Sequence, residues 1–178
     1  MPDSNPINVF KFCPKCGSEN FPAISKRSLK CASCGFHYFI NSSTAVAGIV
    51  INTKGELLLT RRAIQPHFGM LDLPGGFVDP GESAENALIR ELKEELGIEV
   101  EAMEYFGSAP NEYIYSEFTV FTLDLAYCVK PVSLEGLKPM DDISGFEFVL
   151  PEKVDFNELP AISMQYFVRQ LINKNGNY

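Results

Sequence analysis

The sequence has no apolar run long enough to cross a membrane, and its first twelve residues do not resemble a secretory signal. A membrane-spanning helix needs about 20 consecutive apolar residues, and every apolar stretch in this chain is shorter. The opening residues, MPDSNPINVFKF, lack the basic and then apolar order of a signal peptide. We therefore expect a cytoplasmic protein with no membrane partner.

Basic residues are also scarce. The chain has 15 Lys and Arg against 23 Asp and Glu, a formal net charge of −8. Domains that bind nucleic acids usually carry a basic face, so a nucleic-acid partner is not expected. A small anion can still bind if a metal cation mediates the contact. The 178 residues, 46% of them hydrophobic, suffice for one domain with a small appendage.

Four of the five cysteines form two C-x2-C pairs separated by 14 residues. The pairs are Cys13 with Cys16, in CPKCG, and Cys31 with Cys34, in CASCG. This spacing brings four thiolates within reach of one tetrahedral Zn²⁺. The alternative, two disulfides, is disfavoured in a cytoplasmic protein. Because all four ligands are cysteines, we expect a structural zinc ribbon; the fifth cysteine, Cys128, is expected to be a buried strand residue.

The remaining pattern is a mixture of strands and helices. We assign residues 1–40 to the ribbon and residues 41–178 to the main domain. Alternation and turn residues predict strands and two helices. The predicted strands are 44–52, 56–62, 98–109, 117–129 and 146–150, and the predicted helices are 83–96 and 163–174. This order indicates an α/β fold in which helices cover both faces of a mixed sheet.

The first of these helices is unusually acidic. Ser83 is its expected N-cap and Gly97 its expected end. Glu91 and Glu95 are four residues apart and share one face, and Glu94 flanks them. These carboxylates adjoin the apolar stripe of the helix, where charges need partners. Either the helix is a solvated acidic face, or it holds a hard cation such as Mg²⁺ or Mn²⁺ through oxygen ligands.

The segment from Gly76 to Ile98 decides between these alternatives. It fits the pattern G-x5-E-x7-R-E-U-x-E-E-x-G-U, where U is aliphatic, at all nine fixed positions. This resembles the signature of the Nudix hydrolases. The resemblance implies an α/β/α sandwich with a mixed sheet. It also implies an enzyme that hydrolyses the pyrophosphate of a nucleoside diphosphate linked to another group, with Mg²⁺ or Mn²⁺ as cofactor.

The resemblance also implies roles for individual residues. The metal ligands expected from it are Glu91, Glu94 and Glu95, with Arg90 orienting a glutamate and Glu82 more distant. A further carboxylate, as base or metal ligand, is expected at Asp142, with Asp141 as the alternative.

Four residues outside the acidic helix are candidates for substrate binding. Gly76 would let the backbone approach the ligand, and Arg61 could contact phosphate oxygens. Tyr113 and Tyr115 could stack on a base, or could be packing residues of a strand.

A zinc ribbon directly before a Nudix domain resembles the NADH pyrophosphatases. Their motif S-Q-P-W-P-F-P-x-S corresponds here to SAPNEYIYS, residues 108–116, which keeps only some positions. The resemblance implies NAD(H) or ADP-ribose as substrate, and a homodimer. The alternative from another class is a non-catalytic nucleotide sensor, or a zinc-ribbon interaction protein, on a Nudix scaffold.

Overall fold

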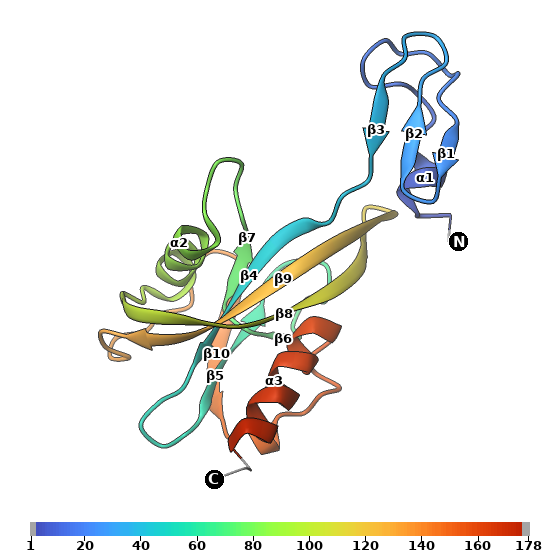
Figure 1. Ribbon diagram of the computed structural model, residues 1–178. Helices are drawn as coiled ribbons and strands as arrows, with labels where there is room; N and C mark the ends of the chain where they lie inside the picture. Colours follow the sequence, from blue (N-terminus) through green and yellow to red (C-terminus); the bar gives the residue numbers. More distant parts are fainter. Residues whose placement is uncertain (1–2, 176–178) are drawn as a thin grey trace. The chain divides into compact units, whose positions relative to one another are not determined.

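The ribbon is built around the two cysteine pairs. The computed structural model describes residues 3–175, and the chain divides into two compact units. Unit 1 comprises residues 1–42 and 112–121. Its elements are α1 (Pro6–Val9) and the antiparallel strands β1 (Ala23–Ser25), β2 (Ser28–Lys30) and β3 (His37–Phe39), in the order β1-β2-β3 (Figure 1). The small core consists of Cys13, Phe21, Leu29 and Cys31.

Residues 112–121 are the tip of a long hairpin that packs within unit 1. The hairpin strands are β8 (Val100–Tyr115) and β9 (Phe118–Pro131). Phe118 lies 5.5 Å from Phe10 between ring centroids, and the hydroxyls of Ser4 and Thr119 are 2.8 Å apart. The predicted strand over 98–109 is therefore too short: strand β8 runs on through Tyr115 and turns at Ser116–Glu117, where both residues have positive φ.

Unit 2 comprises residues 43–111 and 122–178 and holds two sheets. The four-stranded sheet has the order β7-β4-β9-β8, with β4 at Ser43–Val50 and β7 at Gly75–Phe77. Strand β4 is parallel to β9 and antiparallel to β7, so this sheet is mixed, as predicted. The three-stranded sheet has the order β10-β5-β6, and its strands are Ile143–Val149, Leu57–Arg62 and Leu71–Asp72.

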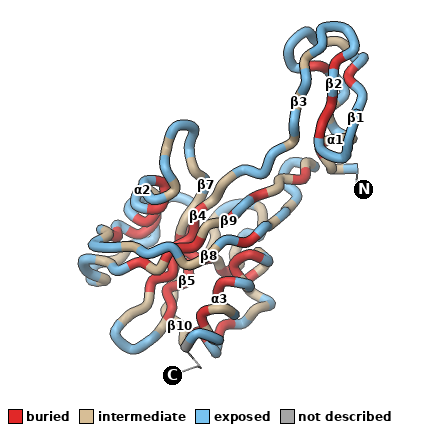
Figure 2. The backbone as a smooth tube through the Cα atoms, in the orientation of Figure 1, coloured by how far each residue is buried: buried red, intermediate tan, exposed pale blue. Residues whose placement is uncertain are grey.

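Alternate residues of β4 point into two separate cores. Val46 and Val50 join the cluster that includes Leu88 and Leu92 of α2 (Ala84–Leu96). Ala47 and Ile49 join the cluster that includes α3 (Ile162–Asn175). The buried segments follow the central strands and the inner faces of the helices (Figure 2). Helices therefore cover both faces, and the predicted fold class is confirmed; a short 3-10 helix, η1 (Pro151–Lys153), precedes α3.

The ends of both predicted helices agree closely with the structure. The hydroxyl of Ser83 accepts a hydrogen bond from the Asn86 N–H at 3.2 Å. Gly97 ends α2 in the left-handed region at φ 71°, and its N–H donates to the carbonyls of Leu92 and Lys93. The apolar side of α3, formed by Met164, Phe167, Val168 and Leu171, is buried. Among residues 3–175, no helix is long and apolar enough to span a membrane.

Replacing Gly97 with alanine should destabilise unit 2. An L-residue in the left-handed region costs about 1–2 kcal/mol, so we expect Gly97→Ala to lower the free energy of unfolding by about 1 kcal/mol. The matched control is Gly107→Ala in β8, where an added Cβ meets nothing within 4 Å and φ is not left-handed. Urea unfolding followed by circular dichroism measures both; equal midpoints for the two variants would contradict the capping role.

Candidate active site

Arg90 gathers the acidic side chains of the Nudix-like segment. Its guanidinium makes a two-pronged contact with Glu82, through Nε at 3.1 Å and Nη2 at 3.0 Å. Nη1 also donates to Glu91 at 2.8 Å and to Glu94 at 3.1 Å, and Nη2 donates to the carbonyl oxygen of Phe77 at 3.0 Å. This arrangement raises the pKa of Arg90 and lowers that of Glu82, chiefly through their mutual hydrogen bonds. One guanidinium thus organises three carboxylates and the end of strand β7.

Glu95 lies beneath this network and is only 6% exposed. Its Oε2 accepts a hydrogen bond from the Gly75 N–H at 3.0 Å. Burial raises the pKa of Glu95 to about 8, and the negative charges of Glu91, Asp72 and Asp141 act in the same direction. Burial also raises the pKa of Glu91, although Arg90 opposes the shift. Both carboxyl groups would gain from a nearby positive charge.

At Gly76 the backbone of β7 lies directly against the side chain of Glu91 on α2. A Cβ at this position would collide with the carboxylate of Glu91. The space that the missing side chain leaves is therefore filled by Glu91. We expected Gly76 to let the backbone approach a bound substrate. In the structure, the group that lies against Gly76 is the carboxylate of Glu91, a candidate metal ligand.

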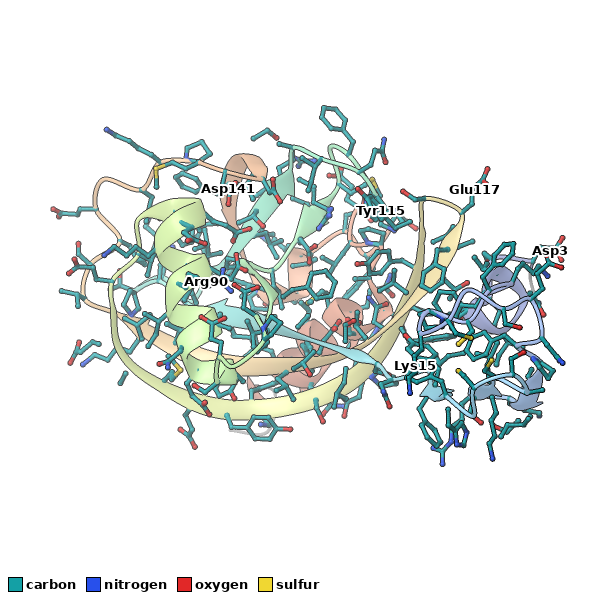
Figure 3. The ribbon with its side chains drawn as sticks, turned by 90° about the horizontal axis from the view of Figure 1, so that it is seen from above. Asp3, Lys15, Arg90, Tyr115, Glu117 and Asp141 are labelled. Carbon is teal, nitrogen blue, oxygen red and sulfur yellow. The ribbon has the colours of Figure 1, made fainter. Side chains whose placement is uncertain are left out.

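The loop after β9 brings Asp141 near the glutamates. The Met140 N–H donates to the carbonyl oxygen of Glu95 at 2.8 Å, which ties the loop to the end of α2. Asp141 lies by that end of the helix (Figure 3) and raises the pKa values of Glu91 and Glu95 by its charge. The backbone carbonyl of Asp142 instead accepts a hydrogen bond from the Ala63 N–H at 2.7 Å. Of the two expected carboxylates, Asp141 acts by its charge on Glu91 and Glu95, and the role predicted for Asp142 stays a prediction.

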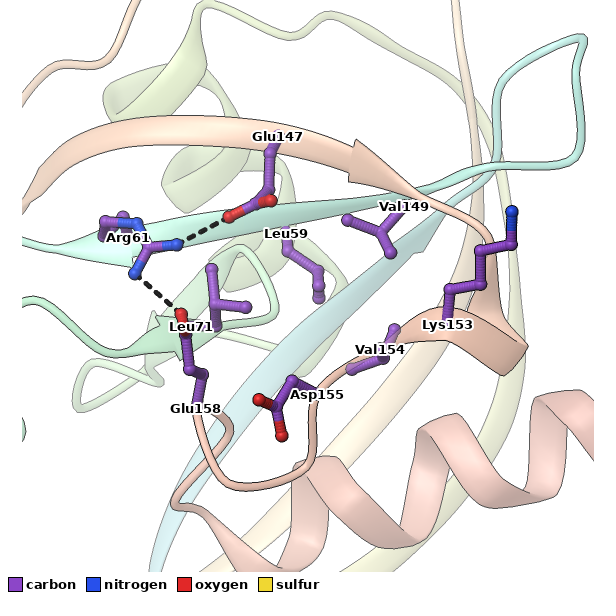
Figure 4. Close-up of a pocket in the computed structure, with 9 residues that line it drawn as sticks. All are labelled: Leu59, Arg61, Leu71, Glu147, Val149, Lys153, Val154, Asp155 and Glu158. Atoms are coloured by element: carbon purple, nitrogen blue, oxygen red, sulfur yellow. Dashed lines mark hydrogen bonds and ion pairs between the residues drawn. The ribbon is translucent and has the colours of Figure 1, made fainter.

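Arg61 is committed to other side chains. It donates to Glu147 at 2.7 Å and to Glu158 at 3.0 Å, at one side of a cavity of about 150 Å³ (Figure 4). Arg62 pairs with the partly buried Asp72 at 2.9 Å. A phosphate would have to compete with these ion pairs to bind either arginine.

The two candidate stacking residues belong to unit 1. Tyr113 and Tyr115 lie on the part of β8 that clusters with the ribbon, and Tyr115 is exposed. The glutamates belong to unit 2. The structure therefore does not bring these tyrosines together with the carboxylates in one unit.

The four cysteines of the ribbon form a compact sulfur cluster. The Sγ atoms of Cys13 and Cys34 are 3.7 Å apart, as are those of Cys16 and Cys31, and no disulfide joins them. Four sulfurs about 2.3 Å from a Zn²⁺ form a tetrahedron with edges of about 3.8 Å, so the cluster fits that ion. Although burial raises the pKa of Cys31, the N–H groups of Cys34 and Ser33 outweigh it and lower that pKa to about 6.

The glutamates of α2 are less closely assembled than the cysteines. Within residues 3–175, the four cysteines are the sole group of three or more His, Cys, Asp or Glu whose ligand atoms all lie within 4.8 Å. Arg90 holds Glu91 and Glu94, whereas Glu95 is held by Gly75. The oxygen donors suit Mg²⁺ or Mn²⁺. To share such a cation, these carboxylates must draw together and partly leave Arg90.

Sequence reasoning missed a second set of buried polar residues. Asp72 in β6 is partly buried and Asp124 in β9 is buried, and Asp124 accepts a short hydrogen bond from the Ser163 hydroxyl. Each lies in an apolar LDL sequence, at 71–73 and 123–125. A charged residue at the centre of an apolar strand is the signal that could have identified them.

The family profile of the NUDIX domain matches residues 42–171, which include this entire acidic site. The chain belongs to the Nudix family. The family expected from the signature is thereby confirmed.

Known members of this family align with parts of the chain. The NAD-capped RNA hydrolase NudC of Pseudomonas aeruginosa is 37% identical over 100 residues, which are 55% of this chain and 34% of the relative. NudC of Vibrio vulnificus is 32% identical over 116 residues, 65% of this chain and 44% of the relative. The matches thus span less than half the length of these Nudix relatives. A NUDIX hydrolase from Nitrosomonas europaea shares the fold, with a TM-score of 0.65, 19% identity and 94% coverage of both chains.

The raised pKa of Glu95 predicts a pH-dependent stability of the Nudix domain without divalent cations. Glu95 keeps its proton up to about pH 8 when folded, but only to about 4.5 when unfolded. The folded state therefore binds one more proton between these values, so the contribution of Glu95 to the free energy of unfolding is lost as the pH rises toward 8. The loss is about 1.4 kcal/mol for each pH unit between the two pKa values, so in full it is about 5 kcal/mol.

The comparison is between the wild type and Glu95→Gln, which resembles the protonated side chain at every pH. Thermal unfolding at pH 5.5, 7.0 and 8.5, in buffer without Mg²⁺ or Mn²⁺, should show similar stability at pH 5.5 and a less stable wild type at pH 8.5. Because other titrating groups are common to both proteins, a difference that stays constant with pH would contradict the raised pKa of Glu95.

Proposed function

We propose that this chain is a divalent-metal-dependent pyrophosphatase that cleaves a nucleoside diphosphate linked to another group, with NAD(H) or ADP-ribose as substrate. The observation that carries the proposal is the network in which Arg90 contacts Glu82, Glu91 and Glu94 above the buried Glu95. This network lies in a Nudix domain whose signature is filled at every fixed position.

The carboxylates would act by holding Mg²⁺ or Mn²⁺. Glu91, Glu94 and Glu95 would bind the cations, which neutralise a pyrophosphate and lower the pKa of a bound water. Arg90 would keep the glutamates in position, because it already holds two of them. Asp141, whose charge acts on two of these carboxylates, is a candidate for the added ligand or base, and Asp142 stays one.

The ribbon would have a structural role. We propose residues 1–40 as a zinc ribbon and residues 41–178 as the Nudix hydrolase domain. The four-cysteine donor set and the 3.7 Å Sγ–Sγ distances support Zn²⁺ as the resident ion. With four cysteine ligands, no coordination position is open for substrate.

Substrates derived from NAD are supported by the relatives. The NudC proteins that match this chain are named as hydrolases of NAD-capped RNA. Tyr113 and Tyr115 stay candidates for stacking on a base, as do Gly76 and Arg61 for contact with the phosphates. A homodimer and a cytoplasmic location also stay predictions; a mass of about 20 kDa by light scattering would contradict the dimer.

The first test is a hydrolysis panel. NADH, NAD⁺, ADP-ribose, FAD and diadenosine polyphosphates are incubated with Mg²⁺ or Mn²⁺, and the products are separated by chromatography. We expect AMP from NADH or from ADP-ribose. Glu94→Gln and Glu95→Gln should lower kcat at least 100-fold, because each removes a charge that holds the cation.

The variants also separate catalysis from folding. Circular dichroism should show that both variants keep the wild-type secondary structure. Full activity in both would overturn the metal site, whereas binding of ADP-ribose without any hydrolysis by the wild type would favour a nucleotide sensor.

A second substrate, NAD-capped RNA, is favoured by the outer face of the ribbon sheet. Residues 1–42 contain five Lys and Arg but only two Asp and Glu, unlike the acidic remainder. Lys30 pairs with His37 across β2 and β3, and the rings of His37 and Phe39 lie 4.1 Å apart. Exposed aromatic rings beside cations are typical of surfaces that bind single-stranded nucleic acids.

A paired assay distinguishes the two substrates. We expect a Phe39→Ala, Lys30→Ala double variant to lose at least fivefold in kcat/KM on NAD-capped RNA while its kcat/KM on free NAD⁺ stays unchanged. A matched control is Lys54→Ala, which removes a cation from the turn after β4. Equal losses on both substrates would contradict an RNA-binding role for this face.

A further inference from the structure

Two buried side-chain oxygens of unit 2 have no hydrogen-bond partner. Among the buried side-chain atoms of residues 3–175, they are Thr122 Oγ1 and Asp124 Oδ1. The two residues are only 3% and 2% exposed. A buried polar atom without a partner costs about 1–3 kcal/mol, and more when it is charged. Two such atoms close together on one strand therefore suggest that a partner comes from outside the chain.

The strand geometry places the two side chains on one face. They are two residues apart on β9, so they point the same way, together with Ala126 of the α3-side core. Their register partners on the parallel strand β4 are Ser43 and Ala45. Both partners are small, so neither a long side chain nor a charge from β4 lies opposite the two oxygens.

The carboxylate of Asp124 is held in a defined orientation. Oδ2 accepts the short hydrogen bond from the hydroxyl of Ser163, at the start of α3. Oδ1 is thereby left as a fixed acceptor, and the hydroxyl of Thr122 lies beside it on the same face. Such a pair is suited to a group that carries N–H or O–H donors, because an ionised carboxylate can only accept.

This pair is electrostatically connected to the candidate active site. Asp72 is partly buried; the desolvation of its carboxylate is the main cause of its raised pKa, and the charge of Asp124 adds to the shift. The charge of Asp72 in turn adds to the raised pKa of Glu95. Asp72 therefore lies close enough to interact electrostatically with both Glu95, the proposed metal ligand, and Asp124.

We infer that Thr122 and Asp124 form a recognition subsite that accepts hydrogen bonds from an N–H or O–H group of the nucleotide substrate. The inference rests on the proposed function, which makes Glu95 part of the catalytic centre. The candidate donors on a substrate derived from NAD are the amino group of adenine, the 2′-hydroxyl of its ribose and the carboxamide of nicotinamide. An acceptor pair selects such groups against analogues with a carbonyl, hydrogen or methyl at the same position.

The variant Asp124→Asn tests this directly. The amide oxygen can accept from Ser163 as Oδ2 does now, and the NH2 group then replaces the free acceptor with a donor. Three pairs of substrates identify the group that is read. They are ADP-ribose against its hypoxanthine analogue, ADP-ribose against its 2′-deoxyadenosine analogue, and NADH against its 3-acetylpyridine analogue.

We expect the wild type to prefer the donor-bearing substrate at least 10-fold in kcat/KM in one pair. Asp124→Asn should reduce that preference to less than threefold, mainly through KM, and should reverse it if adenine is the group. Thr122→Val should weaken the same preference. Ser163→Ala removes the hydrogen bond that orients the carboxylate, so it should weaken the same preference. The matched control is Thr60→Val, which removes another buried hydroxyl of unit 2, on β5, and should leave the preference unchanged.

Two results would overturn the inference. One is a wild type that does not discriminate within any pair, and the other is an Asp124→Asn variant whose three ratios all stay within twofold of the wild type. The second result would mean that water alone occupies the acceptors. If the wild type hydrolyses nothing, the proposed function fails separately. In that case the subsite can still be tested by binding. Dissociation constants of AMP, IMP and 2′-deoxy-AMP are measured by calorimetry for the wild type and for Asp124→Asn, and their ratios are judged by the same limits. This tests recognition of the adenine amino group and of the adenosine 2′-hydroxyl.

Discussion

The shared ion pairs of Arg90 make the acidic helix compatible with a folded domain. Carboxylates at helical spacing repel one another, and Glu91, Glu94 and Glu95 also lie next to the buried side of α2. Arg90 distributes one positive charge over Glu82, Glu91 and Glu94. One charge cannot neutralise all these carboxylates, so negative charge is left over beside the buried Glu95. A divalent cation is the natural complement of that excess.

The sheet contributes as much to this site as the helix does. Gly75 and Gly76 pair with Ala47 and Val46 of β4, which also packs against α2. The same strand pairing therefore presents the Gly75 N–H to Glu95 and leaves the space at Gly76 that Glu91 fills. A change of register by one residue would lose both contacts. The position of the acidic side chains is thus a consequence of β-sheet register.

The features that could be predicted from the sequence are those set by local interactions. The two ends of α2 follow from a side-chain cap at Ser83 and a left-handed residue at Gly97, which only neighbouring residues determine. The cysteine cluster follows from the spacing of two C-x2-C pairs, and the acidic helix from a complete signature. The division of β4 between two cores follows from strand alternation, once the strand is recognised.

The features that could not be predicted depend on contacts between distant parts of the chain. The length of β8 is set by its partner strand and by Phe118 against Phe10, residues more than 100 apart in sequence. The position of Asp141 beside α2 depends on the loop that the Met140 N–H ties to the carbonyl of Glu95. Spacing alone cannot distinguish adjacent aspartates, because each could face the helix after a small change in the loop.

Three acidic side chains of unit 2 lie partly or fully inside the domain, and they are Glu95, Asp72 and Asp124. Desolvation raises the pKa of Glu95 and that of Asp72, so each of these two remains charged only at a cost in free energy. Arg62 offsets this cost for Asp72, and the buried Asp124 accepts a hydrogen bond from the Ser163 hydroxyl. The rest of this free-energy cost is not offset by other groups within the described residues. Apolar side chains in the same places would make the domain more stable. Acidic residues in these positions are therefore better explained by what binds to the domain than by how it folds, and a bound cation with a donor-bearing nucleotide would supply the missing partners.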